Sequence, residues 1–240
     1  MTRNDSKKGN RKPRGAPATL DAFADRMMTA TFSPAASEPE AQAFLRRFAD
    51  YARIDAIFVD QPWVGMAREI LSPLGIRVGV EAAYPVGNWS IQAKAAAIRE
   101  GVRLGAEEID IGGHFAAIKS GDFDAVRDDA RAMIDAAAGE IWVMVLPETA
   151  ILTRDELART LEAYAEGGVG GIKTSSGYGW NTQLEDVYFI RRMFGDTFQI
   201  DVSGGVRTLD HALDYFAAGT DNIHASPIFR ILDEAKERFG

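Results

Sequence analysis

The chain has 240 residues, 46% of them hydrophobic, which is enough for one substantial core, and about 250 residues is typical of a single α/β barrel. The formal net charge is −8, although residues 1–15 carry six Lys or Arg side chains against Asp5 alone. The remainder is therefore strongly acidic, which argues against a nucleic-acid partner because phosphates would be repelled. The chain contains no cysteine, which excludes disulfides, cysteine nucleophiles and thiolate metal sites and fits a reducing cytoplasm.

Residues 1–18 form a basic segment with few apolar side chains. Such a composition cannot bury enough apolar surface to fold, so we expect a disordered basic extension rather than a nucleic-acid arm or a membrane anchor. No apolar run approaches the length of a membrane span, and we expect neither a signal peptide nor a membrane partner. Residues 19–240 contain no Pro/Ser-rich linker and are expected to form one domain.

After this extension, short β-branched runs alternate with longer amphipathic stretches, as in a parallel sheet with helical crossovers. The expected strands, in chain order, are Met27–Phe32, Asp55–Asp60, Arg77–Ala83, Glu108–Gly112, Ile141–Leu146, Gly170–Ser175, Gln199–Ser203 and Asn222–Ser226. The expected helices include Ala93–Leu104, Asp155–Glu166, Leu184–Phe194 and Leu209–Ala218, with Thr153 and Thr208 as N-caps of the second and the last. Eight strand–helix units predict a closed (β/α)8 barrel, the TIM-barrel fold of the α/β class, whose chemistry gathers at the C-terminal ends of the strands.

Three segments place reactive side chains at these strand ends: Glu108–Ile111, Gly171–Gly179 and Asp201–Arg207. Lys173 stands out because a lysine inside a barrel strand is costly to bury as a cation. Lowering its pKa would make it an amine nucleophile toward carbonyl compounds, and a nearby carboxylate could move the protons. The residue pattern equally allows a structural lysine paired with a core carboxylate. The glycine turns after the sixth and seventh strands suit a phosphate site, although ordinary loop geometry also explains them.

Taken together, the three segments resemble the deoxyribose-phosphate aldolase family. The likeness runs from about residue 28 to residue 230, and the motifs follow in the family's order. The close matches are Glu108-Ile109-Asp110, Ile118–Asp122, Lys173–Gly179 and Ser203–Thr208; the looser ones are Tyr84–Gly87, Glu148–Thr153 and Ala225-Ser226.

This resemblance implies a class I aldolase, in which Lys173 forms a Schiff base and Asp110 relays protons. It further implies phosphate binding by Gly177, Gly204, Gly205 and Ser226. The implied reaction is the reversible cleavage of 2-deoxyribose 5-phosphate to acetaldehyde and glyceraldehyde 3-phosphate, with no metal and no cofactor.

The chain also departs from the family pattern. Asp201 stands where the family has a second lysine, Met144 replaces another lysine, and Pro227 stands where a second phosphate-binding serine is usual. A negative neighbour raises the pKa of an amine, so an ionised Asp201 would keep Lys173 protonated at neutral pH. These changes point to a substrate other than the standard sugar phosphate, or to a rebuilt proton relay.

Two histidines lie close to these motifs. His114 follows Asp110 by four residues, and we weigh a general acid or base role equally against a packed loop histidine. His224, in the eighth strand, is expected to be structural. Because the ligand spacing of a metal site is missing, we expect no bound metal.

The leading hypothesis is an aldolase-type lyase with Lys173 as the Schiff-base residue, Asp110 as proton relay, and Asp201 and His114 in the role of the missing lysine. The substrate would be a small aldehyde or a sugar phosphate of carbohydrate metabolism. One alternative keeps the imine but changes the outcome to a dehydratase or a sugar-acid retro-aldolase. Another is a barrel that has lost catalysis and serves as a binding or regulatory subunit, with a Lys173–Asp201 ion pair. A homodimer or a higher homo-oligomer remains open.

Overall fold

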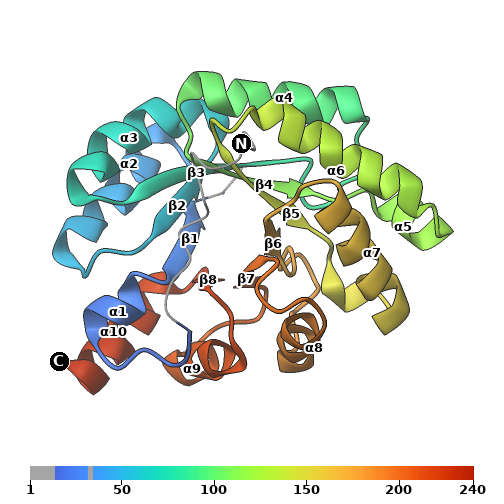
Figure 1. Ribbon diagram of the computed structural model, residues 1–240. Coiled ribbons are helices and arrows are strands. Elements are labelled where there is room, and N and C mark those ends of the chain that lie inside the picture. The colour runs from blue at the N-terminus through green and yellow to red at the C-terminus, as the bar shows by residue number, and fades with distance from the viewer. Residues whose placement is uncertain (1–13, 32–34) are drawn as a thin grey trace.

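The computed structural model describes residues 14–31 and 35–240, and its centre is a closed barrel of eight parallel strands in sequence order (Figure 1). The strands are β1 (Met27–Thr31), β2 (Ala56–Val59), β3 (Arg77–Ala82), β4 (Glu108–Gly112), β5 (Trp142–Leu146), β6 (Gly171–Lys173), β7 (Gln199–Ser203) and β8 (Asn222–His224). β8 pairs in parallel with β1 and so closes the ring. The predicted (β/α)8 barrel is therefore confirmed; Phe32, at the end of the first predicted strand, lies outside the described residues.

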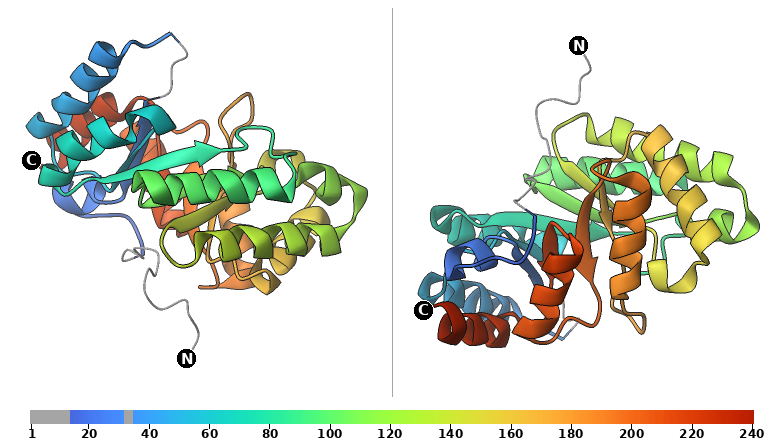
Figure 2. Two further views of the ribbon diagram at one scale, coloured as in Figure 1. Left: turned by 90° about the horizontal axis from the view of Figure 1, so that it is seen from above. Right: turned by 60° about the horizontal axis from the view of Figure 1, so that its bottom comes forward.

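Helices surround the strands on the outside, as Figures 1 and 2 show. They are α1 (Leu20–Ala24), α2 (Glu38–Arg46), α3 (Val64–Leu71), α4 (Ile91–Leu104), α5 (Phe115–Ser120), α6 (Phe123–Ala137), α7 (Arg154–Glu166), α8 (Leu184–Phe194), α9 (Leu209–Ala218) and α10 (Ile228–Phe239). Short 3-10 turns are η1 (Arg47–Asp50), η2 (Gln61–Trp63), η3 (Ser72–Leu74) and η4 (Thr149–Ile151). No helix in the described part of the chain is long and apolar enough to cross a membrane.

Local capping fixes where several helices begin. The hydroxyl of Thr153 accepts from the backbone N–H of Glu156 at the start of α7, and that of Thr208 accepts from the backbone N–H of His211 at the start of α9. In α7 the Glu156 side chain also accepts from the backbone N–H of Thr153, which completes a capping box. Both predicted N-caps are thus confirmed.

The apolar core lies between the barrel and the helices. Side chains that point outward from the strands are fully buried there, for example Ile109 and Ile111 of β4 and Ile200 and Val202 of β7. The alternate positions point into the barrel and are largely polar, which departs from the continuous apolar runs of most parallel sheets. The barrel interior is therefore where charge is concentrated.

Below the strand ends, the barrel interior is crosslinked by Arg77. Its guanidinium contacts Asp55 at 2.7 Å and Glu108 at 2.6 Å. Asn222 of β8 donates to the same Asp55 at 2.8 Å. This network ties β2, β3, β4 and β8 together inside the ring.

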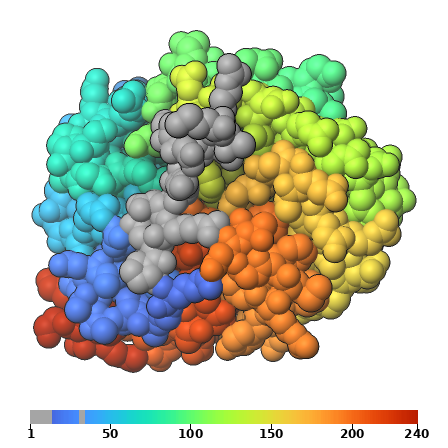
Figure 3. Space-filling model, in the orientation of Figure 1, coloured from blue at the N-terminus to red at the C-terminus, as the bar shows by residue number. Residues whose placement is uncertain are grey.

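The two ends of the described chain meet on one side of the molecule. α1 packs beside α10, and in Figure 3 the blue and red segments lie together at the lower left. α1 begins after the N-cap Thr19, whose side chain accepts from the backbone N–H of Ala22. Most of the expected basic extension, residues 1–13, lies outside the described residues; within residues 14–18, the Gly15 carbonyl accepts from Arg26 Nη1 at 2.6 Å.

Candidate active site

Titratable side chains from five strands converge inside the barrel toward the C-terminal ends of the strands. Residues paired across parallel strands share one face of the sheet. Glu81 of β3 pairs in register with Asp110 of β4, and Lys173 of β6 pairs with Asp201 of β7. His224 is the last residue of β8. The alternation of the strands therefore turns these side chains toward one another.

Lys173 lies between two carboxylates. Its Nζ is 2.7 Å from Asp110 Oδ2 and 2.9 Å from Glu81 Oε1. The rings of Tyr84 and Phe58 lie 4.9 Å and 5.6 Å from the same atom, measured to their centroids, and the residue is only 1% exposed. The amine is therefore held by charge and enclosed by aromatic surface.

The ionisation of Lys173 follows from these neighbours. Burial lowers the pKa of Lys173, but Asp110, Glu81 and Tyr84 outweigh burial and raise that pKa well above its ordinary value. The amine is protonated at neutral pH. A raised pKa of Lys173 was expected from the sequence, but the carboxylates that raise it are Asp110 and Glu81 instead of Asp201.

Asp201 does not pair with Lys173, so the ion pair considered from the sequence is wrong. Lys173 finds its ion-pair partners in Asp110 and Glu81, while Asp201 Oδ1 accepts a 3.1 Å hydrogen bond from Gln199 Nε2. Burial, followed by the neighbouring Glu108 carboxylate, raises the pKa of Asp201 well above its ordinary value. With no cation beside it, Asp201 keeps its proton and adds no negative charge next to Lys173.

The two carboxylates that do contact Lys173 are both hard to ionise. Burial raises the pKa of Asp110 to about 6, with Lys173 opposing the rise. Burial also raises the pKa of Glu81, again against the attraction of Lys173. A carboxylate with a raised pKa accepts and returns a proton near neutral pH more readily than an ordinary one.

Glu81 is a site residue that the sequence did not reveal, and Tyr84 was expected only as part of the looser Tyr84–Gly87 match. Glu81 directly follows the apolar stretch Val78-Gly79-Val80. The alternation of inward-facing and outward-facing side chains along β3 was the signal that could have identified it. That signal could be used only once the register of β3 against β4 was known, because a carboxylate facing inward and one facing solvent look the same in the sequence.

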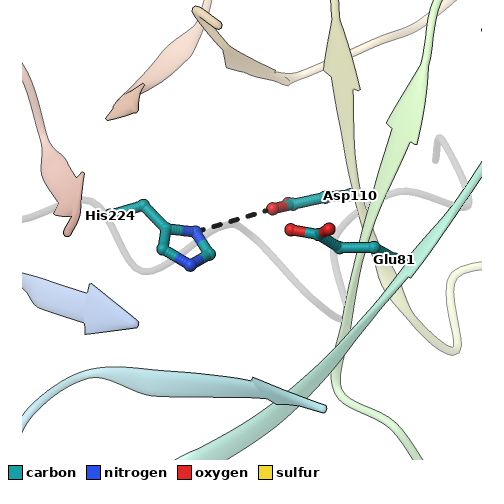
Figure 4. Close-up of side chains that lie close together, drawn as sticks. All are labelled: Glu81, Asp110 and His224. Carbon is teal, nitrogen blue, oxygen red and sulfur yellow. Dashed lines mark ion pairs between the residues drawn. The ribbon is translucent and has the colours of Figure 1, made fainter. Parts of the chain in front are cut away.

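His224 approaches the same carboxylates from the opposite side of the barrel, as Figure 4 shows. Its Nδ1 is 3.8 Å from Asp110 Oδ2, and its ring packs 5.1 Å from that of Phe58. Burial, followed by the charge of Lys173, lowers the pKa of His224 well below its ordinary value, so the imidazole is neutral. The residue expected to be structural therefore belongs to the site.

Glu81, Asp110 and His224 are also the one group among the described residues whose ligand atoms could hold a metal ion, with all three atoms within 4.8 Å of one another. The ammonium of Lys173 already lies between the two carboxylates and neutralises one of their charges. A divalent cation would have to displace it.

His114 lies away from this group. Its Nδ1 accepts from the backbone N–H of Ala117 at 3.3 Å and caps α5, and the residue is absent from the lining of the cavity described below. A ring nitrogen used for capping has no access to a substrate beside Lys173. Of the two interpretations of His114, the geometry favours the packed loop histidine.

A cavity of about 690 Å³ opens from Lys173 toward the loops that follow β6, β7 and β8. The four residues expected to bind phosphate all line it: Gly177, Gly204, Gly205 and Ser226. Arg207 and Arg230 also line this region and make it cationic. The cavity is thus charged differently at its two ends, with the carboxylates near Lys173 and the arginines near the glycine loops.

The loop after β6 is held in place by a buried carboxylate. Glu148 is fully buried, and it accepts from the Ser175 hydroxyl and from the backbone N–H of Ser176 at 3.0 Å. Tyr84 donates its hydroxyl to the Ser176 carbonyl at 2.5 Å. These bonds fix the wall of the cavity opposite the glycines of the β7 loop.

Comparisons with known proteins place the chain among aldolases. No protein-family model matches it. A deoxyribose-phosphate aldolase of Enterococcus faecalis is 30% identical over 204 residues, which is 84% of this chain and 92% of the relative. The solved structure of "QR15, an Aldolase" matches with a TM-score of 0.84 at 28% identity over 90% of this chain and 96% of its own. A tetrameric deoxyribose phosphate aldolase from Aeropyrum pernix matches with a TM-score of 0.83 at 20% identity over 93% and 94%.

Proposed function

This chain belongs to the deoxyribose-phosphate aldolase family, and on that premise we propose that it cleaves and forms carbon–carbon bonds through a Schiff base on Lys173. Membership of this family supports an aldolase-type lyase that acts on a small molecule. The Schiff-base proposal rests on one observation. Lys173 lies at the closed end of a cavity of about 690 Å³, and a carboxylate lies 2.7 Å from its amine.

Asp110 supplies the first proton transfer in this proposal. It takes a proton from the Lys173 ammonium across their 2.7 Å contact and leaves a neutral amine. The amine attacks the carbonyl carbon of the substrate and forms a carbinolamine, whose hydroxyl leaves as water with the proton that Asp110 returns. The resulting iminium draws electrons from the adjacent carbon–carbon bond, which is what an aldol cleavage requires.

The far end of the cavity supports an anionic substituent on the substrate. Gly177, Gly204, Gly205 and Ser226 offer backbone N–H groups and a hydroxyl, and Arg207 is close enough to line the same space. Backbone N–H groups that converge in this way suit a phosphate or a carboxylate. We therefore propose a small aldehyde or a sugar phosphate as substrate, bound without metal or cofactor, and a cytoplasmic enzyme.

Trapping of the imine tests the proposal. The protein is incubated in turn with acetaldehyde, dihydroxyacetone phosphate, pyruvate and deoxyribose 5-phosphate, reduced with borohydride, and mapped by mass spectrometry. At least one compound should leave a reduced adduct on Lys173, and Lys173→Met should abolish it. Lys94, which is fully buried against Asp129, is the internal control and should stay unmodified. An unmodified Lys173 with all four compounds would overturn the proposal.

Product identification separates the remaining alternatives. A dehydratase or a sugar-acid retro-aldolase would form the same adduct but release a dehydrated product or a different pair of carbonyl compounds. A barrel without catalysis would leave Lys173 unmodified. That last alternative has lost its main support, because the Lys173–Asp201 ion pair does not form and Lys173 lines the cavity.

A further inference from the structure

Glu81 is the carboxylate that touches both Lys173 and the cavity. We propose that Glu81 is the acid–base catalyst for cleavage of the carbon–carbon bond, whereas Asp110 serves the formation of the imine at the Lys173 nitrogen. This division of labour rests on the proposed imine chemistry and assigns to Glu81 the proton that moves when the carbon–carbon bond breaks.

Access to the cavity distinguishes the two carboxylates. Glu81 and Lys173 both line it, and Glu81 is the only carboxylate among the described residues that do. Asp110 is 2% exposed and is absent from the lining, although its Oδ2 is 2.7 Å from the same amine. A substrate joined to Lys173 Nζ therefore extends past Glu81, whose Oε1 lies 2.9 Å from that nitrogen.

The other titratable groups that line this part of the cavity are less suited to the task. Tyr84 donates its hydroxyl proton to the Ser176 carbonyl, and burial raises its pKa, so it is a poor acid and is not ionised as a base. His224 is neutral, but burial and Lys173 lower its pKa well below the ordinary value, so it holds a proton weakly. Glu81 remains as the group that both accepts and returns a proton.

The environment of Glu81 agrees with that task. Lys173 faces it across the barrel interior, Asp110 lies beside it on the neighbouring strand β4, and Asp60, which follows β2, adds a further negative charge. Burial raises the pKa of Glu81, Lys173 lowers it, and Asp60 adds a smaller rise. The iminium keeps a positive charge on this nitrogen, and that charge disappears when the enamine forms. Glu81 therefore becomes a stronger base as the carbon–carbon bond breaks.

The cleavage step then balances with one proton. The Glu81 carboxylate takes the proton of a substrate hydroxyl. This hydroxyl stands on the carbon of the breaking bond that lies farther from the iminium. The O–H electrons form the new carbonyl, and the electrons of the carbon–carbon bond form an enamine and neutralise the iminium. After the first aldehyde leaves, protonated Glu81 returns the proton to the enamine carbon and restores the iminium, which water hydrolyses to the second product and the Lys173 ammonium.

Two measurements on Glu81→Gln separate this role from the formation of the imine. The first is borohydride trapping on Lys173, and the second is exchange of the donor's α-hydrogens in D₂O, with acetaldehyde and then pyruvate as the probe. We expect Glu81→Gln to keep trapping but to lose exchange by roughly 10²–10⁴-fold, which is the usual contribution of a general acid–base group. The pH at which trapping is half-maximal should fall by about 1–3 units, because Lys173 loses one of its two counterions.

Two further variants control for structure and for the other carboxylate. Glu81→Asp keeps the charge one methylene farther from the substrate and should recover part of the exchange. Asp110→Asn should lose trapping and exchange together, because the amine is then not released. Trapping with unchanged exchange in Glu81→Gln, or no recovery of exchange by Glu81→Asp in a folded protein, would overturn the assignment of Glu81 alone. If the wild-type protein is never trapped, the proposed imine chemistry fails, and the assignment falls with it.

Discussion

Asp110 and Asp201 are both buried in the barrel, yet they carry different charges. Asp110 has the Lys173 ammonium at 2.7 Å and a pKa raised by burial only to about 6, so it is ionised at neutral pH. Asp201 has only the Gln199 amide, and burial raises its pKa much further. Asp201 therefore adds no negative charge to the site at the position where the sequence resemblance implies a lysine.

Replacement of Asp201 by asparagine tests this protonation state. The folded-state pKa of Asp201 lies above its unfolded value, so its contribution to stability is complete below about pH 4 and is lost as the pH rises toward the folded-state pKa. Asp201→Asn resembles the protonated acid and has no such loss. The variant should therefore be more stable than the wild type at pH 8 and nearly equal to it at pH 4, as measured by urea unfolding. Asn in place of the exposed Asp135 should not change the pH dependence.

The site could be predicted from the sequence to the extent that its residues lie in contiguous motifs. Lys173 and Asp110 were predicted to act together, and their side chains lie 2.7 Å apart. Glu81 was missed because its position becomes meaningful only through pairing with Asp110 across two strands. His114 lies close to Asp110 in sequence, but its place in the chain is the N-cap of α5, where its ring is used locally.

At the scale of elements, the strands were predicted to within a few residues, and the bounds of β4 and β7 agree fully. In both strands, Ile and Val at alternate positions face the helices and polar residues stand between them, so the sequence pattern marks their ends clearly. β6 is shorter than expected and ends at Lys173. The Thr174 backbone N–H still donates to the Asp201 carbonyl, while the side chains of Thr174 and Ser175 bond to Thr182 and Glu148. Side-chain bonding of this kind depends on residues distant in the chain, which periodicity does not reveal.

The loop after β7 approaches the loop after β6 so closely that only glycine fits at one position. Gly204 has φ +87°, and a Cβ there would lie 2.8 Å from the Trp180 carbonyl oxygen. Gly204→Ala should therefore displace the two loops and raise KM for a phosphorylated substrate roughly 10-fold, a binding loss of about 1.4 kcal/mol. Gly179→Ala is the matched control, since Gly179 has φ +93° but nothing within 4 Å of the added Cβ. Equal KM values for the two variants would contradict the expectation.

At the scale of the whole molecule, the barrel interior holds several buried carboxylates that share a small number of cations. Arg77 neutralises Asp55 and Glu108 beneath the site, and burial still raises the pKa of Glu108 to about 7. The polar interior of the barrel therefore depends on Arg77, which lies beneath the site.

Removal of that cation should destabilise the fold. Arg77→Met leaves Asp55 and Glu108 buried without their counterion and should lower the free energy of unfolding by about 3–5 kcal/mol. Arg103→Met is the control: its pair with Glu100 is exposed to solvent and should contribute little to stability. Urea unfolding at neutral pH measures both. A similar, small change in the two variants would mean that the interior charges are solvated.

The storage of Lys173 as an ammonium between Asp110 and Glu81 also decides how the protein meets electrophiles in general. A protonated amine has no lone pair, so stray aldehydes, isocyanates and acylating agents that diffuse into the cavity find nothing to attack them. Such compounds react only with the fraction of Lys173 that has passed its proton to a carboxylate. A bound substrate that favours this proton transfer is therefore captured faster than a compound that is merely reactive.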